Sequence, residues 1–169
     1  KASNPDLVEY TVSEEGELHE MTQDDSRRNP EVSIVHVEGD LFFGAAEFFH
    51  DQVRRVCEDE NLKIVVMKMR NARHLDATSA MAMEELVQHM EARDRHLLVS
   101  EVRPDVMRIF ENSGLIDVIK KENLFEDTPQ NPTLSTAYAL RRAQELLGSE
   151  EADIRIYVTP RKQPDDNAE

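Results

Sequence analysis

The sequence predicts an α/β protein, a sandwich with a mainly parallel open sheet flanked by about four helices. Short apolar runs alternate with segments whose apolar residues recur at helical spacing, in the order β-α-β-α-β-α-β-α after Val32. Residues 62–69 are apolar on both alternations at their centre, as a buried parallel strand should be. A chain of 169 residues that is 39% hydrophobic has the size of one domain with a substantial core.

A β-hairpin is predicted ahead of this pattern. Apolar segments at 7–12 and 18–21 flank an acidic turn that contains Gly16. Residues 22–30 are polar and predict a loop.

The first half of the body predicts two strand–helix units. A β-rich run at 32–37 precedes a helix over about 45–58, and the strand at 62–69 precedes a helix over about 77–92. The expected buried stripes are Ala45, Phe49, Val53 and Val56 in the first helix and Ser79, Met83, Leu86 and Met90 in the second.

The second half continues the alternation with a strand at 96–100. A short helix begins at Pro104 and ends before Gly114, the usual asymmetry of proline at the start and glycine past the end. A short apolar segment at 124–125 is the expected fourth strand. The last helix begins near Asn131-Pro132 and ends at Gly148. Its expected stripe is Ala137, Leu140, Ala143 and Leu147.

Three regions follow from this pattern: a lead-in over 1–30, a domain over 31–148 and an acidic tail over 149–169. The alternating segment at 154–159 is interpreted as an edge strand or as part of the tail. The chain lacks an initiator Met, which favours an excised fragment or a processed product.

Charge and hydropathy exclude several partners. The formal net charge is −15 and the sequence pI is about 4.8, so neither a nucleic-acid backbone nor an anionic membrane surface attracts this chain. No apolar run approaches 18 residues, so direct membrane insertion of this fragment is not expected.

The residues that usually carry catalysis are not arranged for it. The five glycines are too far apart for a dinucleotide-binding turn or a phosphate loop, and the six histidines show no metal-binding spacing. Cys57 is the single cysteine and is expected to be buried and inert, and most methionines are expected to fill the core. The sequence therefore predicts no cofactor, no metal and no enzymatic activity.

The turn before the second body helix has the composition of a functional site. Asp76 is placed to cap the helix, and Thr78 and Ser79 follow in its first turn. Hydroxyls there lie near the positive end of the helix dipole, where a phosphate would be stabilised. Ordinary helix capping explains the same residues equally simply.

Short motifs accompany the predicted strands and helices of the body. They are Glu38-Gly39-Asp40-Leu41-Phe42-Phe43, Leu75-Asp76-Ala77-Thr78-Ser79-Ala80, Val102-Arg103-Pro104-Asp105-Val106, Ser113-Gly114-Leu115 and the helix over 134–147. With these motifs, residues 31–148 resemble a STAS domain, the module of sulfate transporters and anti-sigma-factor antagonists. The lead-in, Val8-Glu9-Tyr10-Thr11-Val12 before an acidic turn, is similar to the segment after the last membrane helix of SulP-type anion permeases.

The resemblance implies an open sheet flanked by helices, no intrinsic catalysis and a location on the cytoplasmic face of the membrane. In the soluble antagonists a partner kinase phosphorylates a Ser two residues after an Asp, and here Thr78 and Asp76 match those positions. Two departures, Ala77 in place of the usual Ser and Ala80 near the usual Gly, argue against such a switch. Nucleotide or acyl-carrier-protein binding is an open question.

The favoured hypothesis is a regulatory and interaction domain of a SulP-type transporter of sulfate, bicarbonate or a related anion. Expected partners are the transmembrane domain of the same transporter, a second copy of the domain and a cytosolic protein. The expected regulatory turn is Asp76, Thr78 and Ser79, and the expected partner surface is Phe42, Phe43, Ala77, Ala80, Met81 and Glu84.

Two alternatives belong to other classes of protein. A free-standing, phospho-regulated antagonist would act on a kinase or sigma-factor partner, but the acidic flanks outside 31–148 argue against it. A small enzyme of flavodoxin-like layout would need a phosphate loop that the sequence does not contain.

Overall fold

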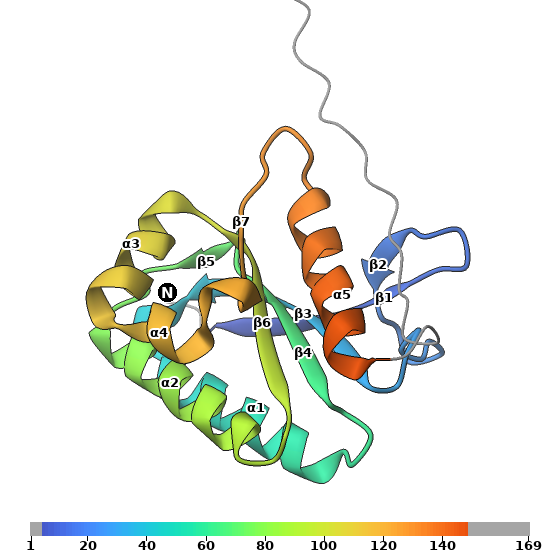
Figure 1. The fold of residues 1–169 in the computed structure, drawn as a ribbon, viewed down its shortest axis with the longest axis horizontal. Helices are drawn as coiled ribbons and strands as arrows, with labels where there is room; N and C mark the ends of the chain where they lie inside the picture. The colour runs from blue at the N-terminus through green and yellow to red at the C-terminus, as the bar shows by residue number, and fades with distance from the viewer. Residues whose placement is uncertain (1–4, 149–169) are drawn as a thin grey trace, which may run out of the picture.

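A computed structural model describes residues 5–148, and they form one mixed seven-stranded sheet with helices on both faces (Figure 1). The strand order is β2-β1-β3-β4-β6-β7, and β5 pairs with β3 beside this path. The strands are β1 (Asp6–Val12), β2 (Leu18–Glu20), β3 (Val32–Asp40), β4 (Ile64–Lys68), β5 (Ala72–Arg73), β6 (His96–Val102) and β7 (Leu124–Glu126).

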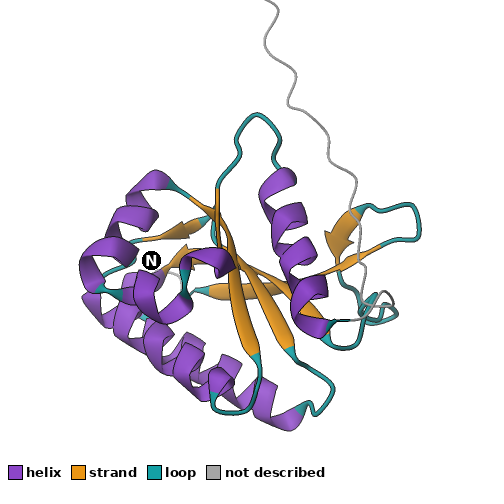
Figure 2. Ribbon diagram, viewed as in Figure 1, coloured by secondary structure: helices purple, strands orange, loops and turns teal. Residues whose placement is uncertain are grey.

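The helices divide unequally between the two faces (Figures 1 and 2). They are α1 (Ala45–Glu58), α2 (Ala77–Glu91), α3 (Pro104–Ser113), α4 (Leu115–Ile119) and α5 (Leu134–Leu147), with 3₁₀ turns η1 (Leu41–Phe43) and η2 (Lys121–Asn123). The first four α-helices lie on one face, where α1 and α2 run side by side, and α5 lies alone on the other. The expected α/β fold with a mainly parallel sheet is confirmed.

Strand alternation decides which side chains face which layer. In the central parallel strands β3, β4 and β6, Val35, Met67 and Val99 point toward α1 and α2, while Ile34 and Val66 point toward α5. Burial on both faces explains why these strands read as nearly continuous apolar runs.

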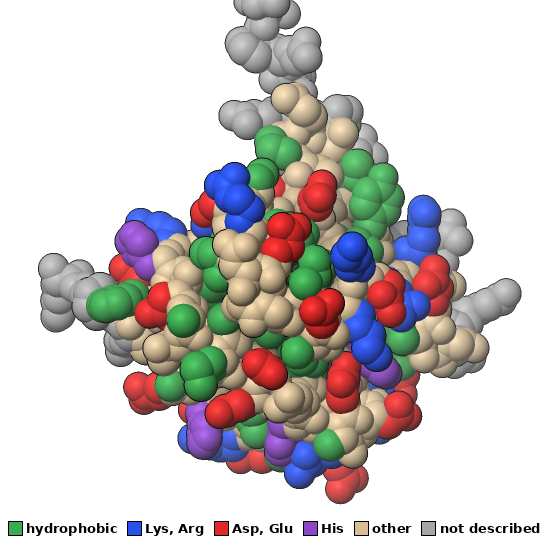
Figure 3. Space-filling view, turned by 60° about the vertical axis from the view of Figure 1, so that its left-hand side comes forward, with side chains coloured by type: hydrophobic (Ala, Val, Ile, Leu, Met, Phe, Trp, Pro, Cys, Tyr) green, Lys and Arg blue, Asp and Glu red, His purple; other side chains and the backbone are tan. Residues whose placement is uncertain are grey.

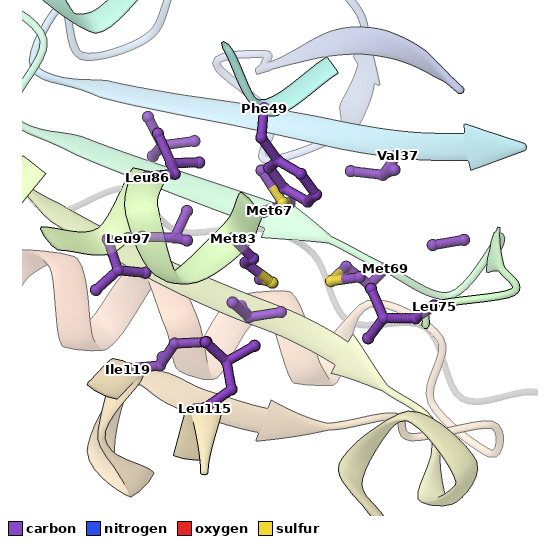
Figure 4. Close-up of a cluster of buried hydrophobic side chains, with 14 of the residues drawn as sticks. Val37, Phe49, Met67, Met69, Leu75, Met83, Leu86, Leu97, Leu115 and Ile119 are labelled. Atoms are coloured by element: carbon purple, nitrogen blue, oxygen red, sulfur yellow. The ribbon is translucent and has the colours of Figure 1, made fainter. Parts of the chain in front are cut away.

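The larger core lies between the sheet and α1–α4 (Figure 4). Phe49 of α1, Met83 of α2 and Met67 of β4 all belong to this core, and all three side chains are essentially inaccessible to solvent. Most methionines are thus core residues, as expected, although Met81 is exposed.

The boundaries of α3 lie at the residues where the sequence predicted that this helix begins and ends. Pro104 opens α3, and Gly114 ends it at φ 77°, a left-handed conformation that a glycine adopts without strain. The short helix α4 and the two-residue strand β5 were not predicted, so residues 5–148 contain five α-helices where about four were expected. Elements this short contain too few residues to display a periodicity.

The buried face of α5 differs from the predicted stripe. Leu140 and Ala143 are buried as expected, but Ala139 replaces Ala137, and Leu147 is only half-buried. Ser135 and Thr136 are also buried, because they contact β6 and β7 through hydrogen bonds.

The predicted N-terminal hairpin is present as β1 and β2, which pair antiparallel. Strand β1 also pairs antiparallel with β3 over five residue pairs, from Asp6 with Glu38 to Tyr10 with Ile34. The lead-in is therefore part of the same sheet as the body. The segment at 154–159 lies outside the described residues.

Cys57 departs from its expected environment. Its thiol is exposed near the end of α1, and its Sγ lies 3.0 Å from Nε2 of His89 on α2. Val56 belongs to the buried face of α1. The next residue of a helix lies about 100° further around its axis, so Cys57 falls outside this face and is exposed.

Candidate functional site

The turn before α2 is held by Asp76. Its Oδ1 accepts hydrogen bonds from the backbone N–H of Ser79 and from the Ser79 hydroxyl, each at 2.8 Å. The backbone hydrogen bond is the main reason that the pKa of the Asp76 carboxyl is lowered. Asp76 is thus the N-cap that the sequence predicted.

The two hydroxyl residues of this turn have different environments. Thr78 is exposed, whereas Ser79 is fully buried, with its Oγ 3.3 Å from the backbone carbonyl of Leu41 as well as bound to Asp76. The hydroxyl of Ser79 is therefore a structural link between α2 and η1. Of the two, only Thr78 offers a hydroxyl to another molecule.

Asp40 forms a second connection between η1 and the residues at the start of α2. Its Oδ1 accepts the backbone N–H of Phe42 at 2.9 Å and caps η1. Its Oδ2 lies 2.7 Å from Nδ1 of His74, which precedes α2 and has a positive φ of 56°. The end of β3 and the start of α2 thus form one connected unit.

This unit presents a mixed apolar and polar surface, here called the turn surface and formed by Phe42, Ala77, Thr78, Met81 and Glu84. Phe42 and Met81 are 63% and 64% exposed. Ala77 and Thr78 are exposed and Glu84 is half-buried.

Two residues of the expected partner surface are not part of the turn surface. Ala80 is 4% exposed, so it packs inside the fold rather than outside it. The side chain of Phe43 lies outside the described part of the structure.

A buried charged cluster at the end of the sheet was not predicted. Glu101 is 1% exposed, and its carboxylate lies 3.5 Å from Nζ of Lys68 and 3.1 Å from Nη2 of Arg70. Arg70 also contacts Asp127 at 2.8 Å. Burial raises the pKa of Glu101 and lowers that of Lys68. The available signal was Lys68 itself, a charged residue at the end of the apolar strand β4.

Charges are otherwise mixed on the surface. Figure 3 shows acidic and basic side chains interspersed on one face, with hydrophobic side chains between them. Within the described part of the chain, no group of three or more His, Cys, Asp or Glu is arranged to hold a metal ion. Between residues 5 and 148, no helix is long and apolar enough to cross a bilayer.

The fold and these motifs define the class of the protein. The STAS domain family model matches residues 25–131, which is more than half of the chain. This chain therefore belongs to the STAS domain family.

Two sulfate transporters of Arabidopsis thaliana are similar in sequence. The chain is 25% identical over 105 residues to the chloroplastic sulfate transporter 4.1 and 22% identical over 102 residues to sulfate transporter 3.2. These alignments cover 56% and 54% of this chain but only 15% and 16% of the relatives. The chain thus corresponds to a small part of the curated relatives that it matches.

Solved structures show the same architecture. A sulfate transporter family protein from Wolinella succinogenes is 25% identical, with a TM-score of 0.59, and the match covers 70% of this chain and 89% of that one. A SulP transporter STAS domain from Vibrio cholerae has a TM-score of 0.54 at 21% identity, covering 70% and 86% of the two chains. A murine Solute Carrier 26 family anion transporter has a TM-score of 0.69 at 12% identity, covering 85% of this chain and 23% of that protein. The last two likenesses show the fold alone.

Proposed function

We propose that this chain is a non-catalytic regulatory and interaction domain of a SulP-type secondary anion transporter, on the cytoplasmic face of the membrane. The family and its similarity to part of two sulfate transporters support this proposal. The transported ion would be sulfate, bicarbonate or a related anion, selected by membrane helices outside this chain.

The turn surface is the proposed contact with the transmembrane domain of the same transporter. Three large hydrophobic side chains are exposed in the described part of the chain, and two of them, Phe42 and Met81, lie on this surface. Exposed apolar side chains that gather in one place mark sites of protein contact. This clustering is the observation that carries the proposal.

The first test is the size and location of the endogenous chain. Native cells are fractionated, and an antibody to this domain detects the protein. A membrane-bound species far larger than 19.4 kDa is expected. A soluble species near 19.4 kDa would overturn the proposal.

The contact itself is tested in the full-length transporter. We expect Phe42→Ser with Met81→Ser to reduce anion uptake per molecule at the cell surface, because the apolar contact is lost. Tyr138→Ser is the matched control, since Tyr138 is the third exposed large hydrophobic and lies on α5. Equal uptake by the double variant and the control would contradict the proposed contact between the turn surface and the transmembrane domain.

A second candidate function rests on Thr78. Its exposed side chain at the start of α2 is accessible to a kinase, as a free-standing antagonist would require. Phosphate on Thr78 in protein isolated from cells, together with a soluble species of domain size, would favour this alternative.

A further inference from the structure

An open hollow of about 930 Å³ lies where several strands end. Glu38 and Gly39 reach it from the end of β3, Arg70 and Asn71 follow β4, and Arg103 follows β6. In open α/β sheets, ligands bind outside the carboxyl ends of the parallel strands. The hollow therefore occupies the position in which this architecture usually binds small molecules.

Three arginines from three different segments line this hollow. Arg70 follows β4, Arg73 ends β5 and Arg103 follows β6. Arg73 is exposed, and its guanidinium makes no hydrogen bond or ion pair with any residue between 5 and 148. Such a concentration of guanidinium groups is unexpected in a chain of net charge −15.

Ion pairs and hydrogen bonds hold the side chains of two of these arginines, Arg70 and Arg103, in place. Arg70 contacts Glu101 at 3.1 Å and Asp127 at 2.8 Å, and the Arg103 guanidinium contacts Asp105 at 3.1 Å and donates to the backbone carbonyl of Arg70. Within the described residues, Nη1 of Arg70 has no partner. Side chains held in this way are preorganised, so little conformational entropy is lost when a ligand binds.

The position of Glu101 supports a role beyond stability. Its carboxylate is buried, and its φ of 57° is positive, a conformation that costs free energy for a residue with a side chain. Burying a charge is also costly unless it is paired. Both costs are incurred at the residue that orients Arg70, as is typical of a binding site.

We propose that this hollow binds a tetrahedral oxyanion of the sulfate or phosphate type, either free or as the phosphate group of a larger ligand. Arginine guanidinium groups bind such oxygens through paired, charge-assisted hydrogen bonds. Asp6 and Glu38 also line the hollow, and their carboxylates repel the anion, which limits its affinity. The inference does not depend on the proposed role in a transporter.

The test is an NMR titration of the ¹⁵N-labelled chain with sodium sulfate, sodium phosphate and glycerol 3-phosphate. Sodium chloride at matched ionic strength is the reference. Saturable shifts are expected at the backbone amides of Gly39 and Asn71 and at the side chain of Arg73. Saturation by the inorganic ions supports a free-ion site, and saturation by glycerol 3-phosphate alone supports a phosphate group on a larger ligand. Shifts that never saturate would overturn the proposal.

The Kd values of three variants distinguish a specific site from non-specific ion binding. Arg73→Gln should raise the Kd about tenfold, because one charge-assisted contact is lost. Glu38→Gln should lower the Kd, because a repelling charge is removed. Arg54→Gln on exposed α1 is the matched control and should leave the Kd unchanged. Equal effects of Arg73→Gln and Arg54→Gln, or no tightening by Glu38→Gln, would show non-specific ion binding and overturn the proposal.

Discussion

Asp76 combines two effects that the sequence alone could not separate. It caps α2 through the backbone N–H of Ser79, and it binds the Ser79 hydroxyl that links α2 to η1. A single carboxylate therefore fixes both the start of a helix and the shape of the turn surface. Loss of this side chain should affect the turn more than the rest of the fold.

Asp76→Ala should lower the free energy of unfolding by about 1 kcal/mol, the usual cost of a lost N-cap. Urea denaturation of the purified domain measures this change. Asp76→Asn is the control, because asparagine caps helices nearly as well. In the full-length transporter, the Ala variant should disturb regulation, and normal transport would show that the turn is only a cap.

His36 is a buried residue with an unusual pH response. It is 8% exposed, and neither ring nitrogen has a hydrogen-bond partner in the described part of the chain. Tyr10, Lys68, Arg70 and Glu38 are the charged or titratable groups around it. Burial, followed by the charge of Lys68, lowers the pKa of His36 from 6.5 to about 4.

His36 should make the domain less stable as the pH falls. The unfolded chain takes up a proton near pH 6.5, whereas the folded chain does so near pH 4, so stability is lost between these values and is fully present above them. The loss should approach about 3 kcal/mol at pH 4. Urea denaturation from pH 4 to 8 measures it, and His36→Gln should flatten the slope. An unchanged slope in that variant would assign the effect to other groups.

At the scale of elements, the N-terminal hairpin is held by ion pairs as well as by the sheet. Arg55 of α1 contacts Glu9 of β1 at 2.9 Å and also binds the hydroxyl of Ser33 in β3. Arg27, in the loop after β2, contacts Asp59 just beyond α1 at 2.6 Å. These contacts connect the first strand to the helical layer, so a displacement of β1 should be transmitted to α1.

Arg55→Ala should destabilise the domain by about 2 kcal/mol, because half-buried Glu9 would lose its nearest positive charge and keep only the more distant Arg27, at 4.0 Å. The neighbouring Arg54→Ala is the matched control: its side chain is 68% exposed, so the change should be about 0.5 kcal/mol or less. Chemical denaturation gives both values. Hydrogen exchange should show faster opening of β1 in the Arg55 variant alone, and equal exchange in both variants would contradict the coupling.

At the scale of the whole molecule, the turn surface and the arginine-lined hollow lie at the same end of the sheet. Both form at the end of β3, since this strand contributes Glu38 and Gly39 to the hollow and Phe42 follows directly after its last residue, Asp40. A ligand in the hollow would thus lie close to the surface proposed to contact the transmembrane domain.

Thr78→Glu tests whether charge at this end changes binding. The new carboxylate should raise the free energy of unfolding by about 0.5 kcal/mol through the dipole of α2. It should also weaken the contact of the turn surface with the transmembrane domain, because a charge enters an apolar contact. Uptake and cross-linking in the full-length transporter measure this, with Thr78→Val as the uncharged control. Unaltered cross-linking and uptake would exclude a phosphorylation switch at Thr78.

The sequence by itself determined the local structure. Periodicity placed the central strands and α1, α2 and α3, and short-range signals such as Asp76, Pro104 and Gly114 marked where helices begin and end. These features depend on interactions between residues a few positions apart, so they can be read from the sequence. The STAS family was recognisable from the same motifs.

Only the tertiary structure decided what lies together in space. The burial of Ser79, the exposure of Cys57 and the cluster of Lys68, Glu101 and Arg70 all depend on packing between segments distant along the chain. Arg70 and Arg103 are 33 positions apart but share a hydrogen bond. No local pattern contains such a pair, because the sheet brings the two residues together through the parallel pairing of β4 and β6.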